Sequence, residues 1–212
     1  MSAMNPEGST PVRPAAPADV ASIVAILTAE LQGDPLAQWL MPDPEQRTYI
    51  SHRLLAVEVS HAVEQGGVDV LSDMSGAAMW RRYPADGGPV LTGQHLGTFT
   101  GPALPRFEQV TSALRSYQSA APHYWLSWLS VHQDFRRQGI AGDLLACRHR
   151  AIDEIGYPIS TVVTTRATRD LLAVHGYRAE LPMQLPGGPT LWPLRRRGRP
   201  VTTAQTGTAP AE

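Results

Sequence analysis

Cysteine is nearly absent from this sequence, which has one, Cys147, among 212 residues. A single thiol cannot close an internal disulfide, so a disulfide-stabilised secreted scaffold is excluded and a reducing compartment fits. Cys147 falls on the apolar side of a helical pattern, where a small buried residue is far more common than a nucleophile. We therefore expect Cys147 in the core.

Long hydrophobic runs are also absent. The longest apolar run near the amino terminus, residues 23–27, is far too short to cross a bilayer. The first twenty residues contain Pro, Ser, Glu and Arg without the apolar stretch of a secretory leader. We expect a soluble, cytoplasmic protein with no membrane partner.

The chain has no excess of positive charge either. Its net charge is −1 and its isoelectric point is near 6.7, so no general basic field favours a nucleic-acid partner. Two arginine groups, residues 81–82 and 195–197, are interpreted as solvated charges. The second group lacks the interleaved aromatic residues that a nucleic-acid-binding tail would carry.

What is present indicates one globular domain over residues 12–197, between polar tails at 1–11 and 198–212 that we expect to be disordered. Helical and strand patterns alternate along it, which predicts an α/β or α+β fold with a mostly antiparallel sheet and one βαβ crossing. The expected strands are 12–14, 68–73, 76–83, 123–131, 159–164, 178–185 and 190–195. The expected helices follow Asp19 and cover 45–65, part of 105–122, the segment after 139, and 167–176.

Apolar spacing predicts which side of each helix is buried. In the first helix Asp19 stands at the N-cap position. In the second, one side holds Ile50, Leu54, Val57 and His61. In the helix after residue 139 the same reasoning selects Ile140, Leu144, Cys147, Ala151 and Ile155. Between the regular elements, residues 84–105 contain Gly or Pro every few positions, and a loop of this length suggests a functional role.

The stretch FRRQGIAGDLLA, residues 135–146, joins an aromatic strand to a helix. The first amide N–H groups of a helix have no internal partner and carry the positive end of the helix dipole. Gly139, Ala141 and Gly142 would let a phosphate approach those amides, and Arg136 and Arg137 would add charge. The pattern is neither a Walker loop nor GxGxxG, and a tight turn without a ligand is the alternative.

RRQGIAGDLL resembles the acyl-CoA loop of the GNAT N-acetyltransferases, R/Q-x-x-G-x-G/A, with Arg136, Gly139 and Ala141 at the fixed places. WLSVHQDF resembles the preceding strand end of that family, and VRPAAPADVASIVAIL resembles its opening strand and helix. LLAVHGYR is similar to its closing helix, with Gly176–Tyr177 starting the next strand. In layout, DPLAQWLMPDPEQR, the helix-containing insertion and HYWL look like the puromycin N-acetyltransferase-like branch.

The resemblance implies a GNAT fold and acetyl-CoA as co-substrate, without a metal. A neutral amine of a small molecule would attack the thioester directly. The implied partner is that amine, in the puromycin-like branch an antibiotic or other secondary metabolite, and a homodimer is compatible with the class. The residues implied to bind the donor are Leu129, Val131, Arg136, Arg137, Gln138, Gly139, Ile140, Ala141, Gly142 and Thr168.

The sequence departs from the family where many members have a tyrosine acid four residues before the closing-helix glycine. Leu172 stands there and cannot donate a proton. Ser130 or a water could replace it, the thiolate could leave unprotonated, or the protein could bind acyl-CoA as a sensor without turnover. Glu30 and Asp34 are candidate bases, although a surface carboxylate and a turn former are the simpler interpretations.

Aromatic residues are the candidates for the acceptor pocket. We expect some of them to belong to the core instead. The set is Trp39, Trp80, Tyr83, Tyr124 and Trp125. A phosphate binder of a different fold, which would rest on the loop alone, is the remaining hypothesis.

Overall fold

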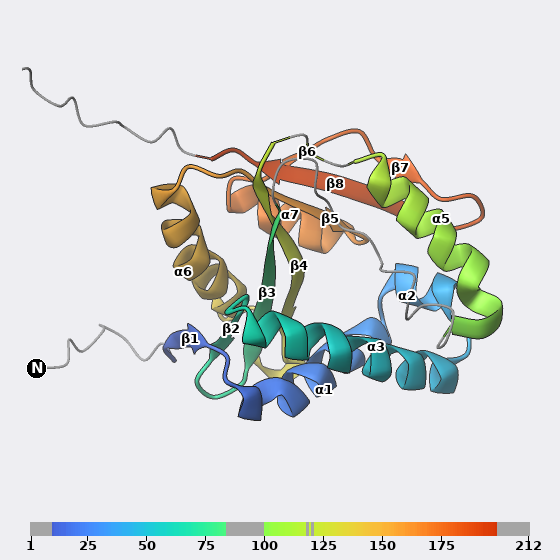
Figure 1. The fold of residues 1–212 in the computed structure, drawn as a ribbon, viewed down its shortest axis with the longest axis horizontal. Coiled ribbons are helices and arrows are strands. Elements are labelled where there is room, and N and C mark those ends of the chain that lie inside the picture. Colours follow the sequence, from blue (N-terminus) through green and yellow to red (C-terminus); the bar gives the residue numbers. More distant parts are fainter. Residues whose placement is uncertain (1–9, 84–99, 118, 120, 199–212) are drawn as a thin grey trace, which may run out of the picture.

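A central eight-stranded sheet organises the protein (Figure 1). The computed structural model describes residues 10–83, 100–117, 119 and 121–198. Nearly all of the expected tails and most of the loop at 84–105 lie outside these residues. The strands are β1 Val12–Pro14, β2 Val68–Leu71, β3 Gly76–Tyr83, β4 His123–Val131, β5 Ile159–Val163, β6 Arg178–Ala179, β7 Met183–Gln184 and β8 Thr190–Arg196.

The sheet runs in the order β1-β2-β3-β4-β5-β8-β6, with β7 beside β8. Among the strands of the described residues, only β4 and β5 pair in parallel; the other pairs are antiparallel. The helix between β4 and β5, α6 (Ile140–Glu154), forms a βαβ crossing, as expected. The mixed, mostly antiparallel α/β fold that the sequence predicts is therefore confirmed. The expected strand at 178–185 is instead two short strands, β6 and β7.

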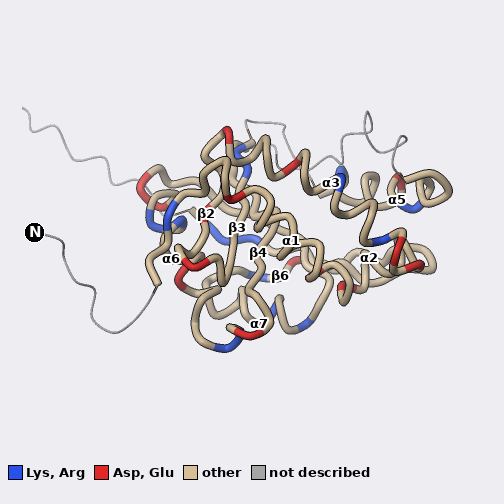
Figure 2. The backbone as a smooth tube through the Cα atoms, turned by 90° about the horizontal axis from the view of Figure 1, so that it is seen from below, with Lys and Arg blue, Asp and Glu red and all other residues tan. Residues whose placement is uncertain are grey.

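Helices cover both faces of the sheet (Figure 1). On one face, α6 and α7 (Arg166–Val174) pack over the cluster that contains Leu144, Ile152 and Leu172. On the other lie α1 (Val20–Leu31), α3 (Pro44–Glu64) and α5 (Leu104–Arg115), with the short α2 (Pro35–Leu40) between the first two along the chain. Within the described residues, no helix has the length and hydropathy of a membrane span. Basic and acidic positions are scattered along the backbone (Figure 2).

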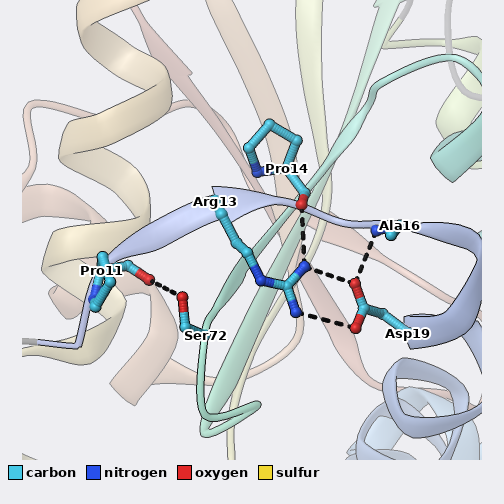
Figure 3. Close-up of polar contacts among 6 residues, drawn as sticks. All are labelled: Pro11, Arg13, Pro14, Ala16, Asp19 and Ser72. Carbon is cyan, nitrogen blue, oxygen red and sulfur yellow. Dashed lines mark hydrogen bonds and ion pairs between the residues drawn. The ribbon is translucent and has the colours of Figure 1, made fainter.

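In the turn between β1 and α1, the side chain of Asp19 is held by several hydrogen bonds (Figure 3). Its carboxylate accepts from both terminal nitrogens of Arg13, at 2.7 and 3.0 Å, and from the backbone N–H of Ala16 at 2.7 Å. These hydrogen bonds, Arg13 first, hold the pKa of Asp19 down to about 2. Asp19 does stand at the N-cap position of α1, as expected, but its side chain caps the preceding turn instead.

The buried side of α3 differs from the expected one. Ile50, Leu55 and Val59 are buried, whereas Val57 is 52% exposed and His61 is also exposed. The buried stripe also contains polar residues such as Ser51. The prediction counted only apolar residues, so it selected a neighbouring stripe of α3 as the buried side.

The same error occurs in α6, where Cys147 is exposed. Ala151 and Ile155 are exposed too, and the core side holds Leu145, His149 and Ile152 in their place. The expectation that Cys147 lies in the core is therefore wrong. The spacing did not reveal this stripe because it contains a polar residue, His149. Arg148 lies beside it, half-buried, and its guanidinium binds both oxygens of Asp69 at 2.7 and 2.8 Å.

His149 is a buried histidine held neutral by its surroundings. Its Nε2 lies 3.0 Å from the hydroxyl of Tyr177, and its ring meets the Trp80 ring edge-on at 5.9 Å. Burial lowers the pKa of His149 to about 4, with a smaller contribution from the positive charge of Arg196. The folded protein therefore resists the protonation that the unfolded chain accepts near pH 6.5.

Acidification is expected to destabilise the protein through this histidine. Between about pH 6.5 and 4 the unfolded chain binds the additional proton, so the free energy of unfolding falls as the pH falls, by about 3 kcal/mol for a shift of this size. Urea unfolding of wild type and His149→Leu at pH 7 and 4.5 measures it. The variant should lose less stability on acidification; an equal loss in both proteins would contradict the assignment.

Candidate functional site

The two parallel strands β4 and β5 separate after a short contact. They pair at Tyr124–Ile159 and Trp125–Ser160 only, and a bulge then shifts the register of β4 against β3 opposite Met79 and Trp80. Beyond the bulge, β4 continues to Val131 without β5. Its outer backbone edge is therefore available to pair with an extended, amide-containing ligand.

Leu129 and Val131 present that free edge. The N–H of His132 donates to the Ser75 carbonyl on the β3 side at 2.8 Å, so strand alternation turns the backbone groups of residues 129 and 131 the other way. In agreement, the Val131 carbonyl accepts a hydrogen bond of 3.2 Å from Nε of Arg136. Arg136 lies in the loop after β4, so this carbonyl does not pair with β3. Both expected donor-binding positions thus face the opening between β4 and β5.

The loop that follows β4 ends at the amino terminus of α6. Gly139 immediately precedes Ile140 with φ of +85°, a left-handed conformation that glycine adopts without strain. A Cβ on Gly139 would have nothing within 4 Å, so open space remains beside the first turn of α6. At Gly142 the limit is space instead: a Cβ there would come within 3.1 Å of the His175 ring.

Positive charge gathers at the same loop. Arg136, Arg137 and Gln138 are exposed, and Arg137 has a positive φ of 65°. The Arg136 guanidinium pairs with the carboxylate of Glu30 at the carboxyl end of α1. Ala141 lies in the first turn of α6, whose free amides and dipole attract an anion. An anion at this loop would compete with Glu30 for Arg136.

Asp34 and Thr168 lie near the carboxyl end of β5. One oxygen of Asp34 accepts from the Ala37 N–H at 2.8 Å and caps α2, and the other accepts from the hydroxyl of Thr164 just after β5. Thr168, in the first turn of α7, has its N–H 3.2 Å and its hydroxyl 2.8 Å from Oγ1 of Thr165. Asp34 therefore ties α2 to the end of β5.

The two residues considered for protonating the leaving group lie on different faces. Ser130 alternates with Leu129 and Val131, is 3% exposed, and its hydroxyl has no hydrogen-bond partner among the described residues. Leu172 is 1% exposed in the core under α6. The position where a tyrosine was expected is thus occupied by a packed core side chain.

Replacing Leu172 by tyrosine should destabilise the fold without creating an acid. A larger polar ring in a filled site forces its neighbours apart, at a cost of about 1–3 kcal/mol, and its hydroxyl would need a partner. Chemical unfolding of Leu172→Tyr beside Leu172→Met measures the loss, and methionine should cost less. A tyrosine variant that kept wild-type stability and gained acyl-transfer activity would contradict this.

The expected aromatic residues divide between the two faces of the sheet. Trp80 packs against His149 and Tyr124 against Tyr157, both on the α6 side. On the opposite face, Tyr83 stacks on His123 with ring centroids 5.5 Å apart. The division follows from strand alternation, because cross-strand partners share a face.

Two further aromatic candidates lie on that opposite face. Trp125 meets Tyr117 edge-on at 6.4 Å, beside the Tyr83–His123 pair in the sheet. Trp39, on α2, packs against Gly188 and carries Arg106 over its ring at 5.6 Å. The face covered by α3 and α5 therefore holds Tyr83 and Trp125, whereas Trp80 and Tyr124 belong to the other face.

Glu58, on α3, is a polar residue at this face that the sequence reasoning missed. Its carboxylate lies 3.6 Å from Arg81, which shares the face of Trp125, and about a third of each side chain is exposed (34% and 30%). Burial raises the pKa of Glu58, against the lowering effects of Arg81 and of a hydrogen bond from Trp128. Its position continues the buried stripe of Ser51, Leu55 and Ala62, a spacing that could have revealed it.

No metal site emerges from the described residues, in which no three His, Cys, Asp or Glu side chains gather suitably. No family model and no curated protein matches the chain.

Solved structures do resemble it. An acetyltransferase from Corynebacterium glutamicum, described as histone acetyltransferase HPA2 and related acetyltransferase, has a TM-score of 0.70 at 19% identity over 91% of this chain and 98% of that one. An agmatine N-acetyltransferase gives 0.66 at 15% identity, over 88% and 98%. The polyamine N-acetyltransferase of Drosophila melanogaster, which forms N-acetylagmatine, gives 0.61 at 14%, over 88% and 98%. At these identities the likeness establishes the fold, which is that of the GNAT acetyltransferases.

Proposed function

We propose that the protein is an acetyl-CoA-dependent N-acetyltransferase that acetylates a primary amine of a small molecule. The observation that carries this proposal is the separation of β4 from β5 directly before a glycine–arginine loop and a helix amino terminus. An extended amide chain that ends in a pyrophosphate matches both parts. The fold shared with acetyltransferases supports it.

On the donor side, the amides of the pantetheine arm pair with the backbone of Leu129 and Val131. The pyrophosphate lies against the first amides of α6, beside Gly139, with Arg136 and Arg137 as counter-charges. Arg136 is now paired with Glu30. Phosphate binding therefore competes with that ion pair and releases the Glu30 carboxylate at the carboxyl end of α1. Thr168, in the first turn of α7, is a further donor contact in this proposal.

On the acceptor side, the amine enters over the face of Tyr83 and Trp125. An alkylammonium ion has a pKa near 10 and must lose a proton before it attacks. Glu58, whose pKa is raised by burial, is a stronger base than an exposed glutamate, and Glu30 is a second candidate. Asp34, engaged by two hydrogen bonds, positions α2 in this scheme.

The reaction balances with these groups. The base takes one proton from the ammonium, and the neutral nitrogen then forms a bond to the thioester carbonyl carbon. The carbon–sulfur bond breaks, and the second proton that the nitrogen loses in becoming an amide passes to the solvent or to the leaving sulfur. The leaving thiolate is stable enough to depart unprotonated or takes a proton from water. Ser130, buried and without a partner, is the candidate side-chain donor, because Leu172 cannot serve.

A finer assignment follows the layout of the chain. The capped α2 after α1 and the helix α5 before β4 stand where the puromycin N-acetyltransferase-like branch has its proline-rich segment and insertion. We therefore propose an antibiotic or other secondary metabolite as the acceptor. We also propose a cytoplasmic location and a homodimer, with residues 12–197 as the catalytic domain.

Release of free CoA measures the proposed activity. The protein is incubated with acetyl-CoA and a panel of primary amines, and the thiol is detected with a chromogenic disulfide. We expect release that depends on an amine. The buried Leu172 favours a second candidate, an acyl-CoA sensor: binding of acetyl-CoA with no release for any amine would support the sensor and contradict the enzyme.

A further inference from the structure

A surface cavity of about 240 Å³ lies at the edge of the sheet formed by β8 and β6. Four arginines line it. Arg178 comes from β6, Arg195 and Arg196 from the end of β8, and Arg197 follows. The fifth lining residue is Gly176, in the turn after α7. The arginine run that the sequence suggested to be solvated is thus built into a strand and a cavity wall.

Neighbouring carboxylates neutralise two of these guanidinium groups, Arg196 fully and Arg195 only in part. Arg196 binds both oxygens of Asp153 at 2.6 and 2.7 Å, with both side chains 13% exposed. Arg195 has Glu180 at 3.8 Å from its Nε, too far for a hydrogen bond. For Arg178 and Arg197 no carboxylate lies within ion-pair distance among the described residues. The cavity therefore has a local excess of positive charge.

The inner wall of the cavity has unused hydrogen-bonding capacity. Nε of Arg195, a lining residue, is buried and has no hydrogen-bond partner in the described part of the chain. Buried donors normally have a partner, and an acceptor-rich ligand would supply one.

We propose that this cavity binds a small, multiply charged phosphate-bearing anion. Guanidinium forks match phosphate oxygens bidentately, and the chain has no lysine, so all 18 of its basic residues are arginine. At about 30 Å³ per water, the volume corresponds to roughly eight water molecules, enough for more than one phosphate group. Two guanidiniums without a carboxylate partner favour a ligand with at least two negative charges.

The arginine end of this site is distinct from the donor loop, although its Gly176 end follows His175, whose ring lies close to Gly142. The proposal does not depend on the proposed function. Arg196 is bound to Asp153 in the last turn of α6, whereas Gly139 precedes its first residue. Fifteen helical residues at a rise of about 1.5 Å place the two ends about 20 Å apart. One phosphate group of the same ligand therefore cannot occupy both places.

Isothermal titration of the full chain with inorganic pyrophosphate at low ionic strength tests the proposal. We expect Arg178→Ala/Arg197→Ala to weaken binding at least about tenfold, as the loss of two charge-assisted contacts predicts. The matched control, Arg53→Ala/Arg166→Ala, removes the same charge from two other exposed positions and should leave the affinity within about twofold. Because the donor loop is itself proposed to hold a pyrophosphate, each titration is repeated in the Gly139→Asp background, where the difference between the cavity pair and the control pair should persist.

Several outcomes would overturn the proposal. They are no binding of pyrophosphate to wild type, an equal loss in the control pair, or a loss caused by Gly139→Asp and not by the cavity pair. The last would assign the anion to the donor loop and would leave the proposed function intact. Unfolding midpoints check that the variants fold, and Arg178→Lys/Arg197→Lys, which keeps the charge and loses the fork, should bind with intermediate affinity.

Discussion

Gly139→Asp is expected to abolish acetyl-CoA binding, with a loss of more than about 100-fold in affinity, or about 2.8 kcal/mol. The substitution places a carboxylate beside the helix amides where the pyrophosphate is expected, so like charges meet and the open space beside Gly139 is filled. It also forces a side chain into a backbone with φ of +85°, which costs about 1–2 kcal/mol of stability.

Gly187 provides a matched control. It also has a positive φ, of 65°, and open space where a Cβ would lie, but it stands in the turn between β7 and β8. Gly187→Asp should therefore lose a similar amount of stability and none of the acetyl-CoA affinity. Titration of both variants, with urea unfolding alongside, separates strain from lost binding. Normal binding by Gly139→Asp would show that the loop assignment is wrong.

Glu58→Gln is expected to lower kcat/KM for the amine by about 100-fold, the typical contribution of a general base, with the KM for acetyl-CoA unchanged. Glutamine keeps the shape of the side chain and removes the charge. Because burial raises the pKa of Glu58, the wild-type rate should fall on acidification at a pH above the usual glutamate range. This acidic limb should disappear in the variant.

Glu64→Gln is the control for Glu58→Gln, because Glu64 is an exposed carboxylate at the end of the same helix. It should leave both the rate and the pH profile unchanged. The informative measurement is the pH profile of kcat/KM with one amine for all three proteins. An acidic limb that persisted in Glu58→Gln would assign the base to another carboxylate, with Glu30 the first to be tested.

Much of the fold could be predicted because local patterns and tertiary structure agree. Strand β4 has the bounds 123–131 that its aromatic pattern predicts, and Gly176 ends the closing helix with a positive φ, as a C-terminal glycine does. The start of α6 after Gly139 followed from the glycine and the apolar spacing. Each of these features depends on residues close together in the sequence.

The errors concern features that depend on distant residues. His149 is buried because Tyr177 and Trp80 surround it, and no spacing rule assigns a histidine to a core. Counting back from Gly176 identified Leu172 as the position of an absent acid. Only packing reveals that its side chain points into the core.

Prediction of the candidate site was limited for the same reason, because its features depend on residues far apart in the sequence. Trp80 and Trp125 both looked suitable for an acceptor pocket, but alternation along neighbouring strands places them on opposite faces. Glu58 was overlooked because its significance comes from Arg81 and Trp128, far along the chain. Leu129 and Val131 were located from the resemblance, and the bulge in β4 explains why their backbone faces the opening.

Isothermal titration of the purified chain with acetyl-CoA tests the central claim most directly, because each part of the proposed function requires the donor to bind between β4 and β5. We predict one site per chain with a dissociation constant of about 10–100 µM or tighter, abolished by Gly139→Asp and retained by Gly187→Asp. Absence of binding by wild type at about 1 mM acetyl-CoA would contradict the account.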